Sequence, residues 1–295
     1  MKNLGILLIL LLLLASCKPK NNQTEVSDNK SKAGNIEISK EAIDDIIQNI
    51  SSPIEMAALV NDLGVPFDKD NLVDLDQIDD YSQNFEMAYA LGMLGADLGY
   101  LNVYNKTGSS VRYLRAINRF ADGLGISEFF DFNTIKYLAT NSSNLDSLIF
   151  LSVRSFNEMD NQLRQTGRTD LSALMIAGVW IEGMYQLTQV TKKQFSADLA
   201  EYIGEQKTIL NNLLIILENF GDDPNFASLI KDYMKLKKSF DSVKISYEIG
   251  EPETMERDGM LIVVQQEKSK VELDADVLND IIEITARIRN KHLES

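Results

Sequence analysis

The side chains best suited to chemistry in this 295-residue sequence are ionisable and aromatic residues set among apolar ones. Helical spacing puts one group along one side of the stretch 85–104: Asp97, Tyr100 and Tyr104. A second group surrounds a carboxylate in the stretch 176–186: Trp180, Glu182 and Tyr185. Because a buried charge is costly unless it is paired, we expect each carboxylate to have a partner.

Three interpretations of these two groups stay open. The first is structural: salt bridges and tyrosine hydroxyls that are satisfied where helices pack. The second is a pocket between helices that binds a sugar, a peptide or a small metabolite. Its candidate residues are Asp97, Tyr100, Tyr104, Arg115, Trp180, Glu182 and Tyr185. The third is an acid pair that works as in glycoside hydrolysis. We favour the structural interpretation and expect no catalytic residues.

Two further patterns concern how the neighbouring helices pack. Three arginines recur at positions i, i+3 and i+7 and therefore share a face: Arg112, Arg115 and Arg119. They either pair with Glu86 and Asp97 or are solvated. The stretch 85–104 also has a narrow side of small residues, which allows another helix to approach closely: Ala88, Gly92, Ala96 and Gly99.

Several common chemistries lack their residues in this sequence. His292 is the only histidine, and it lies near a C-terminal end that we expect to be frayed, so neither a Ser-His-Asp triad nor a histidine-rich zinc site is predicted. The glycines form no nucleotide-binding motif. The acidic stretch 68–80 does not fit the calcium-binding loop of an EF-hand in any register. We expect a solvated, helix-capping loop there, and neither a metal nor a cofactor.

The single cysteine, Cys17, follows a short apolar segment near the start of the chain. Lys2 precedes a run of leucine and isoleucine at 4–14, which is much shorter than the roughly 20 residues that span a bilayer. Leu14-Ala15-Ser16-Cys17 then resembles the lipobox of bacterial lipoproteins of the Bacteroidota type. This resemblance implies cleavage before Cys17, a diacylglyceryl group on its sulfur, and a fatty acyl group such as palmitate on the new amino terminus.

The resemblance also predicts where the protein lies. Residues 1–16 would be the signal peptide, and 17–35 the lipidated cysteine with a polar tether that is too poor in apolar residues to fold. Lys18 and Lys20 stand where surface-displayed lipoproteins carry acidic residues, so we expect the periplasmic face of the outer membrane, with the cell surface as the alternative. The partners expected are the membrane, through the anchor, and an envelope protein. The net charge of −15 argues against nucleic acid.

The remaining residues, 36–295, predict one mostly helical domain. The apolar periodicity is typical of an all-α, irregular multi-helix bundle with a small β-hairpin near the C-terminus. Helices are expected at 39–50, 53–64, 78–104, 109–124, 127–139, 142–165, 169–189, 195–219, 224–241 and 275–291, and strands at 243–249 and 259–266. We expect a non-enzymatic scaffold or binding module, and the sequence leaves its oligomeric state open.

Overall fold

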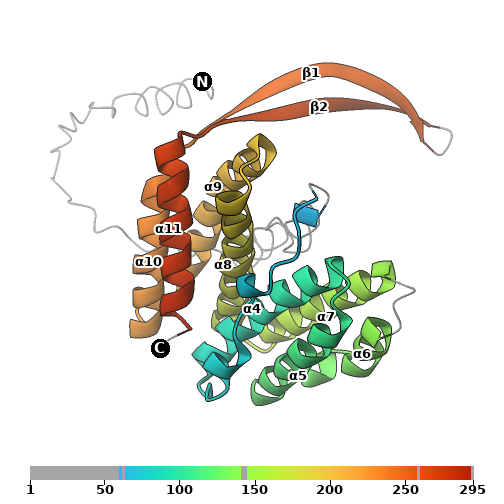
Figure 1. Ribbon diagram of the computed structural model, residues 1–295, viewed down its shortest axis with the longest axis vertical. Helices are drawn as coiled ribbons and strands as arrows, with labels where there is room; N and C mark the ends of the chain where they lie inside the picture. Colours follow the sequence, from blue (N-terminus) through green and yellow to red (C-terminus); the bar gives the residue numbers. More distant parts are fainter. Residues whose placement is uncertain (1–59, 62–63, 141–144, 258–259, 294–295) are drawn as a thin grey trace, which may run out of the picture. The chain divides into compact units, whose positions relative to one another are not determined.

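The computed structural model describes residues 60–61, 64–140, 145–257 and 260–293 of the chain (Figure 1). The chain divides into two units, residues 1–36 and 37–295, and the described residues all belong to the second. The predictions for the signal peptide, Cys17, the tether, the helix at 39–50 and most of the helix at 53–64 lie outside the described residues. None of the helices that the structure describes is long and apolar enough to cross a membrane.

The predicted fold class is confirmed, because the described residues form α-helices and one two-stranded antiparallel sheet. The helices are α4 (Asn84–Val103), α5 (Thr107–Gly123), α6 (Phe132–Thr140), α7 (Leu145–Gln165), α8 (Thr169–Lys193), α9 (Ala197–Glu218), α10 (Pro224–Phe240) and α11 (Ala275–Lys291). Short 3-10 helices lie at Lys69–Asn71, Leu75–Ile78 and Ser127–Phe129. The strands are β1 (Lys244–Arg257) and β2 (Met260–Glu272).

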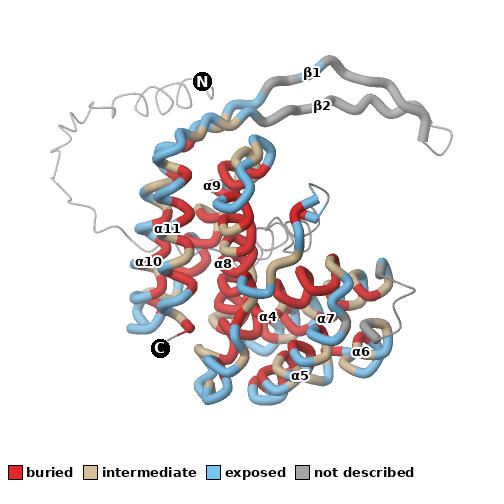
Figure 2. The backbone as a smooth tube through the Cα atoms, viewed as in Figure 1, coloured by how far each residue is buried: buried red, intermediate tan, exposed pale blue. Residues whose placement is uncertain are grey.

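Helix α8 is the centre of the packing, because it contacts α4, α7, α9 and α11. Most of its residues are buried, as Figure 2 shows. The closest approach is to α4, and two glycines make it possible. A Cβ on Gly92 would overlap the carbonyl oxygen of Met175, and a Cβ on Gly178 would overlap that of Tyr89. The small side of α4 thus provides close helix contact as predicted, and it brings Asp97 near α8.

This crossing gives a first test. Gly92→Ala should lower the free energy of unfolding by about 1 to 3 kcal/mol or more, because overpacking forces the backbones apart. The matched control is Gly108→Ala in α5, where a Cβ would meet no atom within 4 Å. That control should be neutral or slightly stabilising, since alanine favours helix. Equal urea midpoints for the two variants would contradict the close crossing.

Several boundaries differ from the prediction, and two of them matter for the site and the hairpin. The long helix begins at Asn84 instead of 78, because residues 75–78 form a 3-10 helix and Gln83 with Glu86 makes a capping box. The strands are longer than predicted, since residues 252–257 pair with 260–265 where a loop was expected. The pairing absorbs one extra residue of β1 between Ile249 and Pro252, which is a β-bulge. Helix α11 has the predicted bounds.

Candidate functional site

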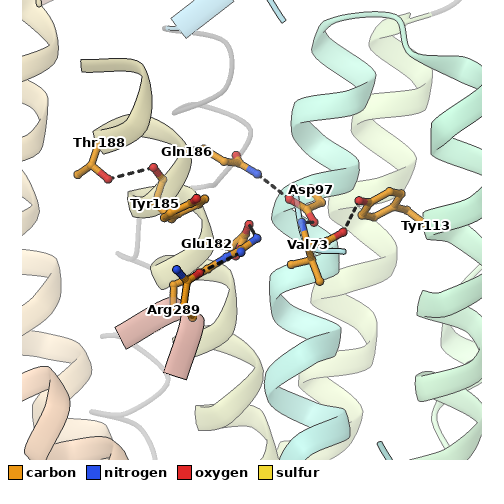
Figure 3. Close-up of polar contacts among 9 residues, drawn as sticks. Val73, Asp97, Tyr113, Glu182, Tyr185, Gln186, Thr188 and Arg289 are labelled. Atoms are coloured by element: carbon orange, nitrogen blue, oxygen red, sulfur yellow. Dashed lines mark hydrogen bonds and ion pairs between the residues drawn. The ribbon is translucent and has the colours of Figure 1, made fainter. Parts of the chain in front are cut away.

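Four polar side chains from three helices meet in the interior, and we call them the polar core cluster: Asp97, Glu182, Gln186 and Arg289 (Figure 3). Helix α4 supplies the aspartate, α8 supplies the glutamate and the glutamine one turn apart, and α11 supplies the arginine. All four residues are buried. The cluster joins the two carboxylates that the sequence singled out.

Glu182 and Arg289 form a bidentate ion pair. The guanidinium Nε donates to Oε2 and Nη2 donates to Oε1, each at 2.9 Å. The side chains are 0% and 6% exposed, respectively. The ring of Tyr185 lies 4.4 Å from the guanidinium carbon and covers it. Burial by itself lowers the pKa of Arg289, but the Glu182 carboxylate outweighs it, so this pKa lies above its ordinary value. Arg289 therefore keeps its positive charge in this buried position.

Asp97 accepts two hydrogen bonds, from the backbone N–H of Val73 at 2.9 Å and from Nε2 of Gln186 at 2.8 Å. No cation is among these partners. Burial, followed by the negative charge of Glu182, raises the pKa of Asp97 well above its usual 3.8. Two ionised carboxylates beside one guanidinium would leave the cluster with one negative charge in a poorly solvated interior. These surroundings favour the protonated form of Asp97 more than water does.

The acidic stretch 68–80, which was predicted to be a solvated loop, instead packs over this cluster. We call residues 65–80 the strap. Asp68 and Asp74 cap its two 3-10 helices, as predicted. However, Val73 and Ile78 are buried in the core, which corrects the expectation of a solvated loop. Alternation of these apolar residues with the acids is the sequence signal for this burial.

Side chains of the neighbouring helices hold the backbone of the strap. Tyr104 donates to the carbonyl of Val65 at 2.7 Å, and the hydroxyl of Tyr100 accepts from the N–H of Asp68 at 3.1 Å. Tyr113 donates to the carbonyl of Val73 at 2.5 Å, and the N–H of the same residue donates to Asp97 (Figure 3). Both backbone groups of Val73 are therefore hydrogen-bonded to side chains. The predicted residues Tyr100 and Tyr104 are therefore anchors of the strap.

The remaining predicted residues lie apart from the cluster. Trp180 is fully buried and donates from Nε1 to Gln206 of α9 at 3.2 Å. Arg115 is exposed, as the solvated alternative for the arginines expected. Arg119 does make contacts, but with Asp79 and the carbonyl of Ile78, not with Asp97 or Glu86.

His292 itself is packed, which corrects the expectation of fraying at this residue, while residues 294–295 lie outside the described part of the chain. Its ring packs against Tyr89 with centroids 5.4 Å apart, and its carbonyl accepts from Tyr81 at 2.9 Å. Nε2 lies 3.5 Å from a carboxylate oxygen of Asp232. Burial lowers the pKa of His292, with Asp232 opposing this shift. Leu293 beside it, the last residue that the structure describes, is also buried.

Sequence reasoning missed Arg289, Gln186 and the backbone of Val73. A signal for Arg289 was present: it lies four residues after Thr285 and seven after Ile282, on the buried face of α11. An arginine on an apolar face requires a buried acid, and Glu182 is that acid. For Gln186 the signal was its position one turn after Glu182 on the same helix.

The cluster can hold a proton and a fixed ion pair, and its carboxylates face the chain's own donors. Among the described residues, no three histidine, cysteine, aspartate or glutamate side chains gather as metal ligands would. Comparison with known proteins adds no relative: no protein-family model, no curated protein and no solved structure matches this chain.

Proposed function

We propose that this protein is a lipid-anchored component of the bacterial cell envelope, attached through Cys17, whose helical domain serves as a non-enzymatic scaffold or binding module. The anchor rests on the lipobox resemblance of Leu14-Ala15-Ser16-Cys17. Lipid chains of this kind hold a protein to the bilayer at about 0.8 kcal/mol for each buried methylene, and two or more chains make attachment durable. The outer membrane, at its periplasmic face, is the location that the residues after Cys17 favour.

The non-enzymatic role is proposed because the carboxylates of the polar core cluster are buried and already paired within the chain. A glycoside hydrolase acid pair needs substrate and water between its two carboxyl groups. Here Asp97 and Glu182 are both 0% exposed, and the N–H groups of Val73 and Gln186 and the guanidinium of Arg289 donate to them. The residues best able to do acid-base chemistry therefore hold helices α4, α8 and α11 and the strap together. A helical domain held together in this way is suited to the role of a scaffold.

The experiment for the anchor is the variant Cys17→Ser of the full chain in a Gram-negative host. We expect this variant to leave the membrane fraction, because it has no sulfur to carry the diacylglyceryl group. Lys18→Ser is the matched control, since it changes the next residue and leaves the four lipobox residues intact. Its distribution should equal that of the unmodified chain. Retention of Cys17→Ser in the membrane fraction at the unmodified level would refute the anchor.

A further inference from the structure

The hairpin near the C-terminus forms a ribbon whose two edges differ. Strands β1 and β2 pair with each other, and no third strand joins them among the residues that the structure describes. The base of the ribbon packs on α9, where Gly204 makes room for Val243 and Val271. A two-stranded ribbon is marginally stable in water, and a third strand stabilises it.

The edge formed by β1 carries several features that hinder further strand pairing. Pro252 has no backbone N–H to donate, and the bulge between Ile249 and Pro252 interrupts the ladder. The same strand carries acidic residues at positions 251, 253 and 256. Charges, proline and bulges are the devices by which proteins block an edge. The β1 edge is therefore a poor site for a partner strand.

The edge formed by β2 has none of these devices over its distal half. Residues 260–266 read MLIVVQQ, without a charge or a proline, and residues 260–265 pair with 252–257 without a register shift. Alternate residues of an antiparallel edge strand direct their N–H and C=O groups away from the sheet. A segment of high β-propensity and no charge on such an edge is a template for another strand. The β2 edge is thus the open one.

We propose that residues 260–266 of β2 pair antiparallel with the same residues of a second copy of this chain, which makes a four-stranded sheet in the order β1-β2-β2-β1. Pairing an uncharged segment with itself places no like charges opposite each other. A two-fold axis near Val263 closes the assembly at two copies. This proposal does not depend on the lipid anchor.

The net charge favours a contact between the ribbons over a contact between the helical bodies. Each chain has a formal charge of −15, so two helical bodies repel at short range. Val263 lies nine residues from Glu272 at the base of the ribbon, which is about 30 Å of strand. The Debye length at physiological ionic strength is about 8 Å. The ribbons therefore join the copies while salt screens the repulsion between the bodies.

The test uses the full chain, extracted in detergent, and the substitution Val263→Lys. This variant places two lysines opposite each other at the two-fold axis, so we expect its dimer dissociation constant by analytical ultracentrifugation to rise at least tenfold. The matched control is Thr254→Lys, which adds the same charge at the residue paired with Val263 on the blocked strand. Thr254→Lys should dimerise as the unmodified chain does. Far-ultraviolet circular dichroism checks that both variants keep the helical body.

A covalent readout identifies the occupant. Val263→Cys in a chain that also carries Cys17→Ser should give a disulfide-linked product of twice the chain's mass under mild oxidation, and the chain with Cys17→Ser alone, which has no cysteine, should not. Three results would overturn the proposal. The unmodified chain could stay monomeric at about 100 μM, it could form open-ended polymers, or position 263 could crosslink to a different protein. Failure of this test leaves the result with Cys17→Ser unaffected, so the two proposals are separable.

Discussion

Replacing Arg289 with methionine should lower the free energy of unfolding by about 3 to 5 kcal/mol, the range measured when one partner of a buried ion pair is removed. The reason is that Glu182, which is 0% exposed, would lose both of its bonds to the guanidinium. Asp97 beside it would lose the positive charge of Arg289, which favours its ionised form. Urea unfolding followed by circular dichroism measures the change.

Two variants make this prediction specific. Arg287→Met removes an exposed arginine two residues earlier in the same helix, and it should change the stability by less than about 0.5 kcal/mol. The double variant Glu182→Met with Arg289→Met removes both charges, so it should recover most of the loss, because an apolar pair of similar volume is often neutral or stabilising. A double variant less stable than Arg289→Met alone would contradict the assignment of these two residues as a pair.

The second large effect concerns the pH dependence of stability and Asp97. Since the pKa of Asp97 is raised in the folded state above 3.8, the folded chain binds a proton that the unfolded chain releases. The unmodified protein should therefore lose stability relative to Asp97→Asn as the pH rises above about 4, by up to tenfold in the folding equilibrium constant per pH unit until the folded pKa is reached. The variant should be the more stable form at pH 8.

The asparagine side chain has partners at this position. Its Oδ1 can accept from the N–H of Val73, and its Nδ2 can donate to Oε1 of Gln186, an atom that is buried and has no hydrogen-bond partner in the described part of the chain. Asp80→Asn is the control, because Asp80 is exposed. A stability difference between Asp97→Asn and the unmodified chain that stays constant from pH 4 to pH 8 would show that folding does not raise the pKa of Asp97.

The helices could be predicted from the sequence because their signals are local. Apolar periodicity gave α11 with its observed bounds, and the Asp223-Pro224 cap gave the start of α10. The hairpin was placed correctly but cut short, since a segment with glycine and proline at 250–252 reads as a loop. Whether residues 250–252 form a strand or a loop depends on their pairing with the other strand, which the sequence of one segment does not reveal.

The carboxylates of the site could be predicted from the sequence, but the residues that pair with them could not. Asp97 and Glu182 were recognisable as charges in apolar helices, but they are partnered by residues far along the chain. Arg289 is 107 residues from Glu182, and Val73 is 24 residues from Asp97. Such contacts depend on how the helices cross, so spacing within one helix does not reveal them. The burial of the strap followed from the same tertiary contacts and was missed for the same reason.

The most direct test of the proposed role is mass spectrometry of the N-terminal peptide of the full chain, extracted from the envelope of a Gram-negative host. The lipid anchor predicts a peptide that begins at Cys17 and carries a diacylglyceryl group on the sulfur together with a fatty acyl group on the amino terminus. A peptide that still contains residues 1–16, or a mature chain whose Cys17 retains a free thiol, would contradict the central claim that this protein is held to the envelope by lipid.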